Sequence, residues 1–166
     1  AREISSLLTG KRNTSGNNAK YSEEEIVKQF SEIKKESHIE FNQEQEKAIL
    51  SAFTEPLVIV TGGPGTGKTT LMDYISTMMD GCSKLFLTKT HTALENMIRR
   101  ITSPGGVHEF MGIDSFLNSY VDSDYDVVFV DECSTISNSD MLRLLSRRRL
   151  LMFWWDIPWM PSRILI

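Results

Sequence analysis

The spacing of apolar residues predicts helices in the first third of the chain. Apolar side chains recur at helical spacing over residues 22–38 and again over 42–54. Ser22 and Glu25 have the spacing of a capping box, in which the side chain of each residue accepts a hydrogen bond from the backbone of the other. Asn42 is a favourable N-cap for the second helix. We therefore expect two helices before the main part of the fold.

Farther along, short β-branched runs without polar alternation predict strands that are buried on both faces. These runs are "LVIV" at 57–60, "KLFLT" at 84–88, "DVVFV" at 126–130 and "LLMFW" at 150–154. The stretches between them with helical character are 68–79, 91–102, 113–120 and 138–146. Alternation of strands and helices predicts an α/β fold, with a parallel sheet and helices on both of its faces.

Composition divides the chain further. Residues 1–21 are rich in Asn, Ser, Gly and Lys and are expected to form a flexible leader, followed by N-terminal helices over 22–55. We expect the core over 56–149 and an unusual aromatic-rich tail over 150–166. No run is apolar enough for a signal peptide or a membrane span, so we expect a cytoplasmic protein without a membrane partner.

Charge and cysteine content exclude little. The net charge of −4 gives no overall basic field, so any nucleic-acid binding would depend on a local groove. Cys82 and Cys133 are too few for a disulfide framework, and we expect both to be small buried side chains.

The segment "GGPGTGKT" at 62–69 matches the phosphate-binding P-loop pattern G-x-x-x-x-G-K-[ST], also called Walker A. A predicted strand ends just before it and a predicted helix begins near Lys68, as this motif requires. Lys68 is expected to contact the β- and γ-phosphates of ATP, and the Thr69 hydroxyl to bind Mg²⁺. The residues expected to bind nucleotide here are Gly62, Gly63, Pro64, Gly65, Thr66, Gly67, Lys68, Thr69 and Thr70.

A second acidic motif, Walker B, follows the apolar run 127–130 in "YDVVFVDECST". Parallel sheets bind ligands at the carboxyl ends of their strands, so this motif and the P-loop should converge. Asp131 is expected to bind Mg²⁺. Lys68 and Glu132 are the expected catalytic residues, and Glu132 would take a proton from the attacking water. The sequence therefore predicts an ATPase.

Over about 40–146, these motifs and their order resemble the superfamily 1 helicases, particularly the RecD/TraA-like group with an AAA-type P-loop motor. The segments that carry the resemblance are "FNQEQEKAI", "GGPGTGKTT", "LTKTHTALENMIRRI", "GIDSFL" and "VDECST". The resemblance implies the N-terminal part of a first RecA-like domain, incomplete in this chain. It also implies a second motor domain or a partner protein that supplies an arginine finger.

The resemblance also implies further site residues. A glutamine before the P-loop would contact adenine, with Gln43 the first candidate and Gln45 the second. The residues implied to contact single-stranded nucleic acid, with DNA favoured over RNA, are Thr88, Thr90, His91, Thr92 and Phe116. Arg99 and Arg100 would add positive charge.

Ordinary structural roles stay open for each of these residues. Thr90 or Thr92 could cap a helix, and Phe116 could be a core residue. Arg99 and Arg100 could form a solvated helix end that the helix dipole favours.

Two places depart from the family pattern. Asp114 stands where the family has His in T-x-H-S-F, and an acidic side chain there would repel phosphate. If Asp156 aligns with the family's G-D-x-x-Q, then Trp155 and Trp159 replace its Gly and Gln. We consider three explanations for the tail: a truncated or misread final strand, a divergent strand of an inactive relative, and a segment that docks on a membrane or a partner.

Three functions stay open from the sequence. The favoured one is the first motor domain of a helicase or translocase, which alone would hydrolyse ATP weakly and not unwind duplexes. The second is a stand-alone P-loop NTPase that acts as a switch or assembly factor on a protein partner. The third is a small-molecule phosphotransferase.

Overall fold

The computed structural model describes residues 22–37, 40–102, 105–119, 125–146, 150–156 and 163–165. For the last two ranges it describes the course of the backbone. The predicted leader over 1–21 and Trp159 of the predicted tail lie outside the described residues.

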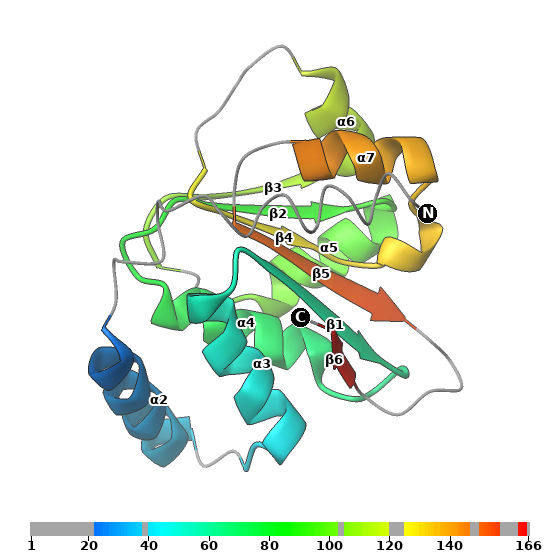
Figure 1. The fold of residues 1–166 in the computed structure, drawn as a ribbon. Helices are drawn as coiled ribbons and strands as arrows, with labels where there is room; N and C mark the ends of the chain where they lie inside the picture. The colour runs from blue at the N-terminus through cyan, green and yellow to red at the C-terminus, as the bar shows by residue number, and fades with distance from the viewer. Residues whose placement is uncertain are drawn as a thin grey trace.

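Helices and strands alternate along most of the described chain (Figure 1). The helices are α2 (Glu23–Ser37), α3 (Gln43–Thr54), α4 (Lys68–Met78), α5 (His91–Arg100), α6 (Ile113–Asn118) and α7 (Asn138–Ser146). The strands are β1 (Leu57–Gly62), β2 (Lys84–Thr88), β3 (His108–Gly112), β4 (Val127–Val130), β5 (Leu150–Asp156) and β6 (Arg163–Leu165). A short 3₁₀ turn, η3, covers Cys133–Thr135.

The strands form one sheet in the order β3-β2-β4-β5-β1-β6. All neighbouring pairs are parallel except β1 and β6, which are antiparallel. The predicted fold class is therefore confirmed: an α/β fold of the P-loop type, with a mainly parallel sheet. β5 lies between β1 and β4, in register with Phe129 opposite Met152 and with Ile59 opposite Phe153.

Helices cover both faces of the sheet (Figure 1). Alternate strand residues divide between two hydrophobic clusters because successive side chains of a strand point to opposite faces. Phe86 and Phe129 stack at 4.8 Å between ring centroids, in the cluster under α2, α3, α4 and α5. Leu87 and Val130 lie in the other cluster, with α6 and α7. Burial on both faces explains why the strand runs lack polar alternation.

The two N-terminal helices begin at the predicted caps. Glu25 N–H donates to Ser22 Oγ at 3.2 Å, and Ser22 N–H donates to Glu25 Oε2 at 2.7 Å. Asn42 and Gln45 form the same reciprocal arrangement at the start of α3. The Ser22 contacts hold the pKa of Glu25 below its ordinary value, the backbone hydrogen bond being the larger cause. Both helix starts are thus fixed by local side-chain contacts.

Two further features are the placement of the cysteines and the apolar character of the helices. Cys82 and Cys133 are both buried, as expected. Among the described residues, none of the helices has both the length and the apolar character needed to span a bilayer.

Candidate nucleotide-binding site

The P-loop leaves the carboxyl end of β1 and leads directly into α4. Gly65 and Gly67 have φ angles of 76° and 79°, in the left-handed region that residues with a Cβ rarely adopt. Gly67 is also the N-cap of α4, so no side chain caps this helix. The amino end of α4 therefore presents backbone amides and the positive end of its dipole to the loop.

Lys68, the first residue of α4, bends back over the loop. Its Nζ donates to the carbonyl of Gly62 at 2.9 Å and to the carbonyl of Gly63 at 2.6 Å. Thr66 Oγ1 also donates to the Gly63 carbonyl, at 2.9 Å. The ammonium group is thus held at the mouth of the loop, where a flexible lysine is suited to contact phosphate oxygens.

Asp131 and Glu132 follow β4 at the same edge of the sheet. Asp131 N–H donates to the Leu87 carbonyl at 2.8 Å, which extends the pairing of β4 with β2 by one residue. Asp131 Oδ1 accepts from Glu132 N–H at 2.9 Å. Glu132 has a φ of 54° and is the one residue other than glycine with a positive φ among those that the structure describes. Strained backbone of this kind is concentrated at functional sites.

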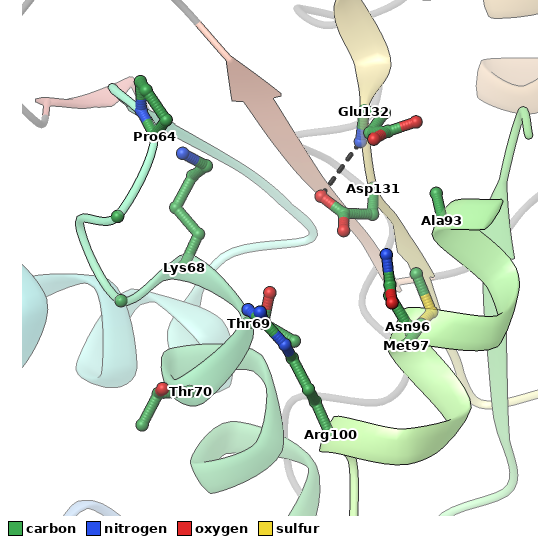
Figure 2. Close-up of a pocket in the computed structure, with 12 residues that line it drawn as sticks. Pro64, Lys68, Thr69, Thr70, Ala93, Asn96, Met97, Arg100, Asp131 and Glu132 are labelled. Carbon is green, nitrogen blue, oxygen red and sulfur yellow. Dashed lines mark hydrogen bonds between the residues drawn. The ribbon is translucent and has the colours of Figure 1, made fainter.

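The P-loop and the acidic pair face each other across one pocket with a volume of about 220 Å³. Figure 2 shows Lys68 on one wall and Asp131 with Glu132 on the facing wall. The pocket is lined by Pro64, Gly65, Gly67, Lys68, Thr69, Thr70, Ala93, Asn96, Met97, Arg100, Asp131 and Glu132. The convergence that the two motifs require is therefore present in the fold.

The side chains in this pocket suit a magnesium nucleotide. Mg²⁺ prefers oxygen ligands, and Thr69 offers a hydroxyl and Asp131 a carboxylate to the same pocket. Glycine amides and the Lys68 ammonium are donors of the kind that bind phosphate oxygens. The residues present fit both expected cofactors.

Thr90 connects the nucleotide pocket to the end of β2. It is the N-cap of α5, accepting from Ala93 N–H at 3.2 Å, as the capping alternative predicts. Its hydroxyl also donates to Glu132 Oε2 at 3.3 Å. His91 and Thr92 are exposed in the first turn of α5, whereas Thr88 is fully buried. The Thr88 hydroxyl has no hydrogen-bond partner among the described residues.

Phe116 lies in the hydrophobic core and not on the surface. Its side chain is 5% exposed and belongs to the cluster between the sheet and the layer of α6 and α7. In this conformation the ring is not accessible for stacking on a base, and the core role that the sequence left open describes its position.

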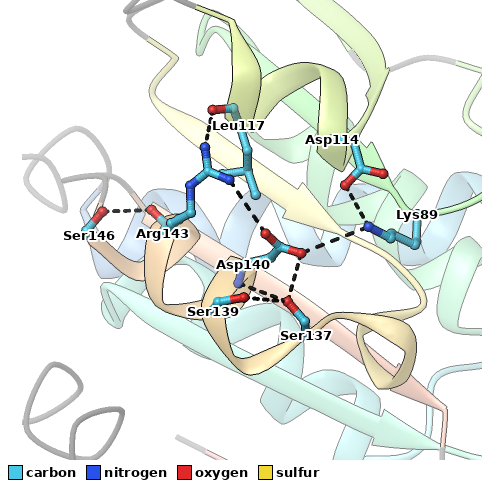
Figure 3. Close-up of polar contacts among 8 residues, drawn as sticks. All are labelled: Lys89, Asp114, Leu117, Ser137, Ser139, Asp140, Arg143 and Ser146. Carbon is cyan, nitrogen blue, oxygen red and sulfur yellow. Dashed lines mark hydrogen bonds and ion pairs between the residues drawn. The ribbon is translucent and has the colours of Figure 1, made fainter.

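Asp114, the acidic substitution in that segment, is paired with a lysine. Lys89 Nζ lies 2.6 Å from Asp114 Oδ1 and 4.0 Å from Asp140 Oδ2 (Figure 3). The hydrogen bond that Lys89 donates to Asp114 is the main reason that the pKa of Lys89 lies above its ordinary value. Arg143 continues the network, donating to the Leu117 carbonyl at 2.6 Å. Much of the repulsion expected from Asp114 is thus balanced locally.

The two glutamine candidates occupy different positions. Gln43 is exposed and is not among the pocket-lining residues. Gln45 Nε2 donates to the Thr66 carbonyl of the P-loop at 3.3 Å, and its Oε1 accepts from Asn42 N–H at 3.0 Å. The second candidate therefore hydrogen-bonds to the P-loop.

One wall of the pocket was not predicted from the sequence. Ala93, Asn96, Met97 and Arg100 all line it from α5. Their spacing, i, i+3, i+4 and i+7, marks one face of a helix and is the signal that identifies them together. From the sequence, Arg100 was expected to add positive charge for nucleic acid or to form a solvated helix end, and Asn96 was not singled out.

Comparison with known proteins gives a family and a set of structural similarities. A family model described as "AAA domain" matches residues 45–153. The structure of arterivirus nonstructural protein 10 (helicase) with DNA is 19% identical, with a TM-score of 0.46 over 67% of this chain and 31% of that chain. The structure of PRRSV nsp10 (helicase) is 20% identical, with a TM-score of 0.44 over 66% and 28%. This chain thus spans less than a third of the length of either structure.

The family match begins at Gln45, which contacts the P-loop, and ends within β5. It includes both faces of the pocket and agrees with the resemblance to superfamily 1 helicases in the motifs. Because the match covers well over half of the 166 residues, the chain belongs to the AAA domain family.

Proposed function

We propose that this chain is the ATP-binding part of the first motor domain of an ATP-dependent helicase or translocase, and that it hydrolyses ATP with Mg²⁺. The observation that carries the proposal is the shared pocket, in which Lys68 and Thr69 face Asp131 and Glu132. A phosphate-binding lysine and a carboxylate pair on facing walls suit hydrolysis of a phosphoanhydride.

Each side chain has a role in this proposal. Lys68 binds the β- and γ-phosphate oxygens, and Thr69 and Asp131 hold Mg²⁺, which supplies neutralisation of phosphate charge. Glu132 accepts a proton from water as the water oxygen bonds to the γ-phosphorus and the bond to the β-phosphate oxygen breaks. A side-chain carboxylate next to the metal-binding Asp131 favours hydrolysis over transfer to a small acceptor.

Single-stranded nucleic acid, with DNA favoured, is the proposed partner. Thr90, His91 and Thr92 are exposed at the carboxyl end of β2, and Thr90 also touches Glu132. A strand bound there would lie one hydrogen bond from the proposed catalytic base. A second motor domain or partner protein would supply an arginine finger, typically worth ~10³–10⁵ in rate. The chain alone therefore hydrolyses ATP weakly and does not unwind duplexes.

Two variants test the nucleotide chemistry. Lys68→Ala should weaken MgATP binding at least ~10-fold, because a charge-assisted contact to phosphate is lost. Glu132→Gln should keep affinity but lower turnover ~10²-fold or more, because an amide cannot take up the proton. Binding is measured by calorimetry and turnover by phosphate release. Unchanged affinity in Lys68→Ala would remove the phosphate assignment.

Nucleic acid then separates the motor from the protein-switch alternative. Single-stranded DNA should raise the ATPase rate and bind with an affinity that falls steeply with salt. A double-stranded oligonucleotide with the same total number of phosphates is the control. If no nucleic acid alters turnover while ATP promotes binding of a protein, the helicase proposal is wrong and the switch is right.

A further inference from the structure

The wall of the pocket opposite the P-loop is formed by a single face of α5. Ala93 and Met97 are buried, while Asn96 and Arg100 are exposed and line the pocket. Ala93 and Met97 hold α5 against the core, and Asn96 and Arg100 border the space between α5 and α4. In Figure 2, the Arg100 side chain extends from the end of α5 toward Thr69.

The backbone position of Arg100 is fixed by contacts of the two residues that follow it. Ile101 is buried, and its N–H donates to the Met97 carbonyl at 2.9 Å, closing the last turn of α5. The next residue, Thr102, donates from its N–H to Asp73 Oδ1 at 3.0 Å. Because Asp73 belongs to α4, this bond ties the end of α5 to the helix that carries the P-loop lysine. The backbone that carries Arg100 is therefore held in place beside α4.

Arg99 and Arg100 differ in their surroundings although they are neighbours. Arg99 lies 3.8 Å from Glu95 in an i, i+4 pair, is 75% exposed and is not among the pocket-lining residues. Arg100 has neither an ion pair nor a hydrogen bond with any described residue and lines the pocket. A role shared by both arginines, such as interaction with the helix dipole, does not account for this difference.

The charges in the pocket indicate what Arg100 would bind. Lys68 and Arg100 line it from α4 and α5, and an anion bound in this pocket would be attracted by both positive charges. Asp131 and Glu132 are its acidic groups, and Asp131 is already assigned to Mg²⁺. A polyphosphate has enough oxygens to accept hydrogen bonds from both side chains, and the planar guanidinium suits phosphate oxygens because it donates two parallel hydrogen bonds.

We propose that Arg100 is a nucleotide-binding residue that contacts the polyphosphate from α5, giving this domain a second phosphate-binding cation besides Lys68. The inference rests on the proposed function and adds a residue to the same site. Arg100 would then help to bind ATP before it is hydrolysed. This role is separate from that of an arginine that another domain supplies to speed hydrolysis.

The test is calorimetric titration of the full chain with MgATP and, separately, with inorganic tripolyphosphate. Arg100→Ala should weaken both ligands about 10-fold or more, in the range typical of a charge-assisted contact. Arg99→Ala removes an equal charge from the same helix end and should change both affinities by no more than about 2-fold, as a matched control. Arg100→Lys should recover part of the loss, because it keeps the charge but not the bidentate geometry.

Arg100→Gln keeps most of the side chain and serves as a second variant, with far-UV circular dichroism to check folding. Equal effects of Arg99→Ala and Arg100→Ala would overturn the inference, because the contribution would then be general surface charge. A loss for MgATP but not for tripolyphosphate would also overturn it, since Arg100 would then contact the nucleoside.

Lys68→Ala distinguishes this inference from the proposed function. If Lys68→Ala weakens tripolyphosphate and Arg100→Ala does not, the P-loop site stands and the role of Arg100 is wrong. If the unaltered chain binds neither MgATP nor tripolyphosphate, the proposed function itself fails.

Discussion

At the scale of single residues, Glu132 combines a chemical role with an unfavourable backbone. A left-handed φ costs a residue with a Cβ roughly 1–2 kcal/mol, and Glu132 has a φ of 54°. A glycine would adopt this geometry without strain, so the glutamate lowers the stability of the fold at this position. Glu132 lines the nucleotide pocket, which gives a functional reason for its presence.

We predict that Glu132→Gly stabilises the chain while it removes ATP turnover. Relief of strain, offset by the greater freedom of glycine in the unfolded chain, should raise the free energy of unfolding by about 0.5–1 kcal/mol. Urea unfolding measures this change. Glu132→Gln is the control, because it removes the carboxylate but keeps the strain and should leave stability nearly unchanged. A destabilised glycine variant would contradict the argument.

Thr90 gives a second prediction at this scale, because its hydroxyl both caps α5 and contacts Glu132. Thr90→Val should lower the free energy of unfolding by about 1 kcal/mol through loss of the cap. It should also lower ATP turnover roughly 10-fold, because the proposed base loses the group that orients it. Phosphate release and urea unfolding give the two readouts.

Thr90→Ser keeps the hydroxyl and should preserve both properties. Ser137→Ala removes a comparable cap from α7, where Asp140 N–H donates to Ser137 Oγ at 3.2 Å. It should lower stability by a similar amount without altering turnover. If both cap losses lower turnover equally, Thr90 acts through stability alone.

At the scale of elements, the sequence predicted the buried strands and missed those at the edges of the sheet. The core strand β4 is a continuous apolar run because helices cover both of its faces. β3 begins with exposed His108 and Glu109, and β6 has only three residues, so neither shows a periodic pattern. Both are edge strands, whose pairing depends on a neighbour already in place.

In the candidate site, too, features made by contiguous residues were predictable from the sequence and features made by packing of distant segments were not. The P-loop and the acidic pair were predictable because each is a contiguous motif with its own chemistry. The wall formed by Asn96 and Arg100 was not, because it depends on how α5 packs beside α4. For Phe116 the motif resemblance suggested a stacking surface and the sequence left a core role open; in the fold, packing buries the ring.

The contact between the end of β2 and α6 gives a prediction about nucleic acid. Lys89 is paired with Asp114 at 2.6 Å, next to the exposed Thr90–Thr92 segment. Asp114→Asn should free the lysine charge, raise single-stranded DNA affinity about 3-fold and make the salt slope steeper by nearly one phosphate contact. Binding is measured by fluorescence anisotropy at several salt concentrations.

Glu95→Gln is the matched control for this variant. It also removes one negative charge paired with a cation, but on exposed α5 surface at Arg99. It should leave the salt slope nearly unchanged. If both variants raise affinity equally, the effect is one of net charge and gives no support to a groove at the end of β2.

For the whole molecule, the decisive feature is the place of β5 in the sheet. β1 carries the P-loop and β4 carries the acidic pair, yet the two strands are not neighbours, since β5 hydrogen-bonds to both. The segment that departs most from the family pattern is therefore also the one that sets the separation of the two halves of the pocket. This position favours the strand interpretation of residues 150–156 over a membrane-docking or partner-docking segment.

We therefore predict that deletion of 150–166 abolishes both cooperative unfolding and MgATP binding, because β1 and β4 each lose a partner strand along their length. Deletion of 163–166 removes only edge strand β6, which pairs with β1 alone, and should leave a cooperative transition with MgATP affinity within about 3-fold. Thermal unfolding followed by circular dichroism and titration with MgATP measure the two effects. If the longer deletion still binds MgATP as the full chain does, then β1 and β4 can hold the P-loop and the acidic pair in place without a strand between them.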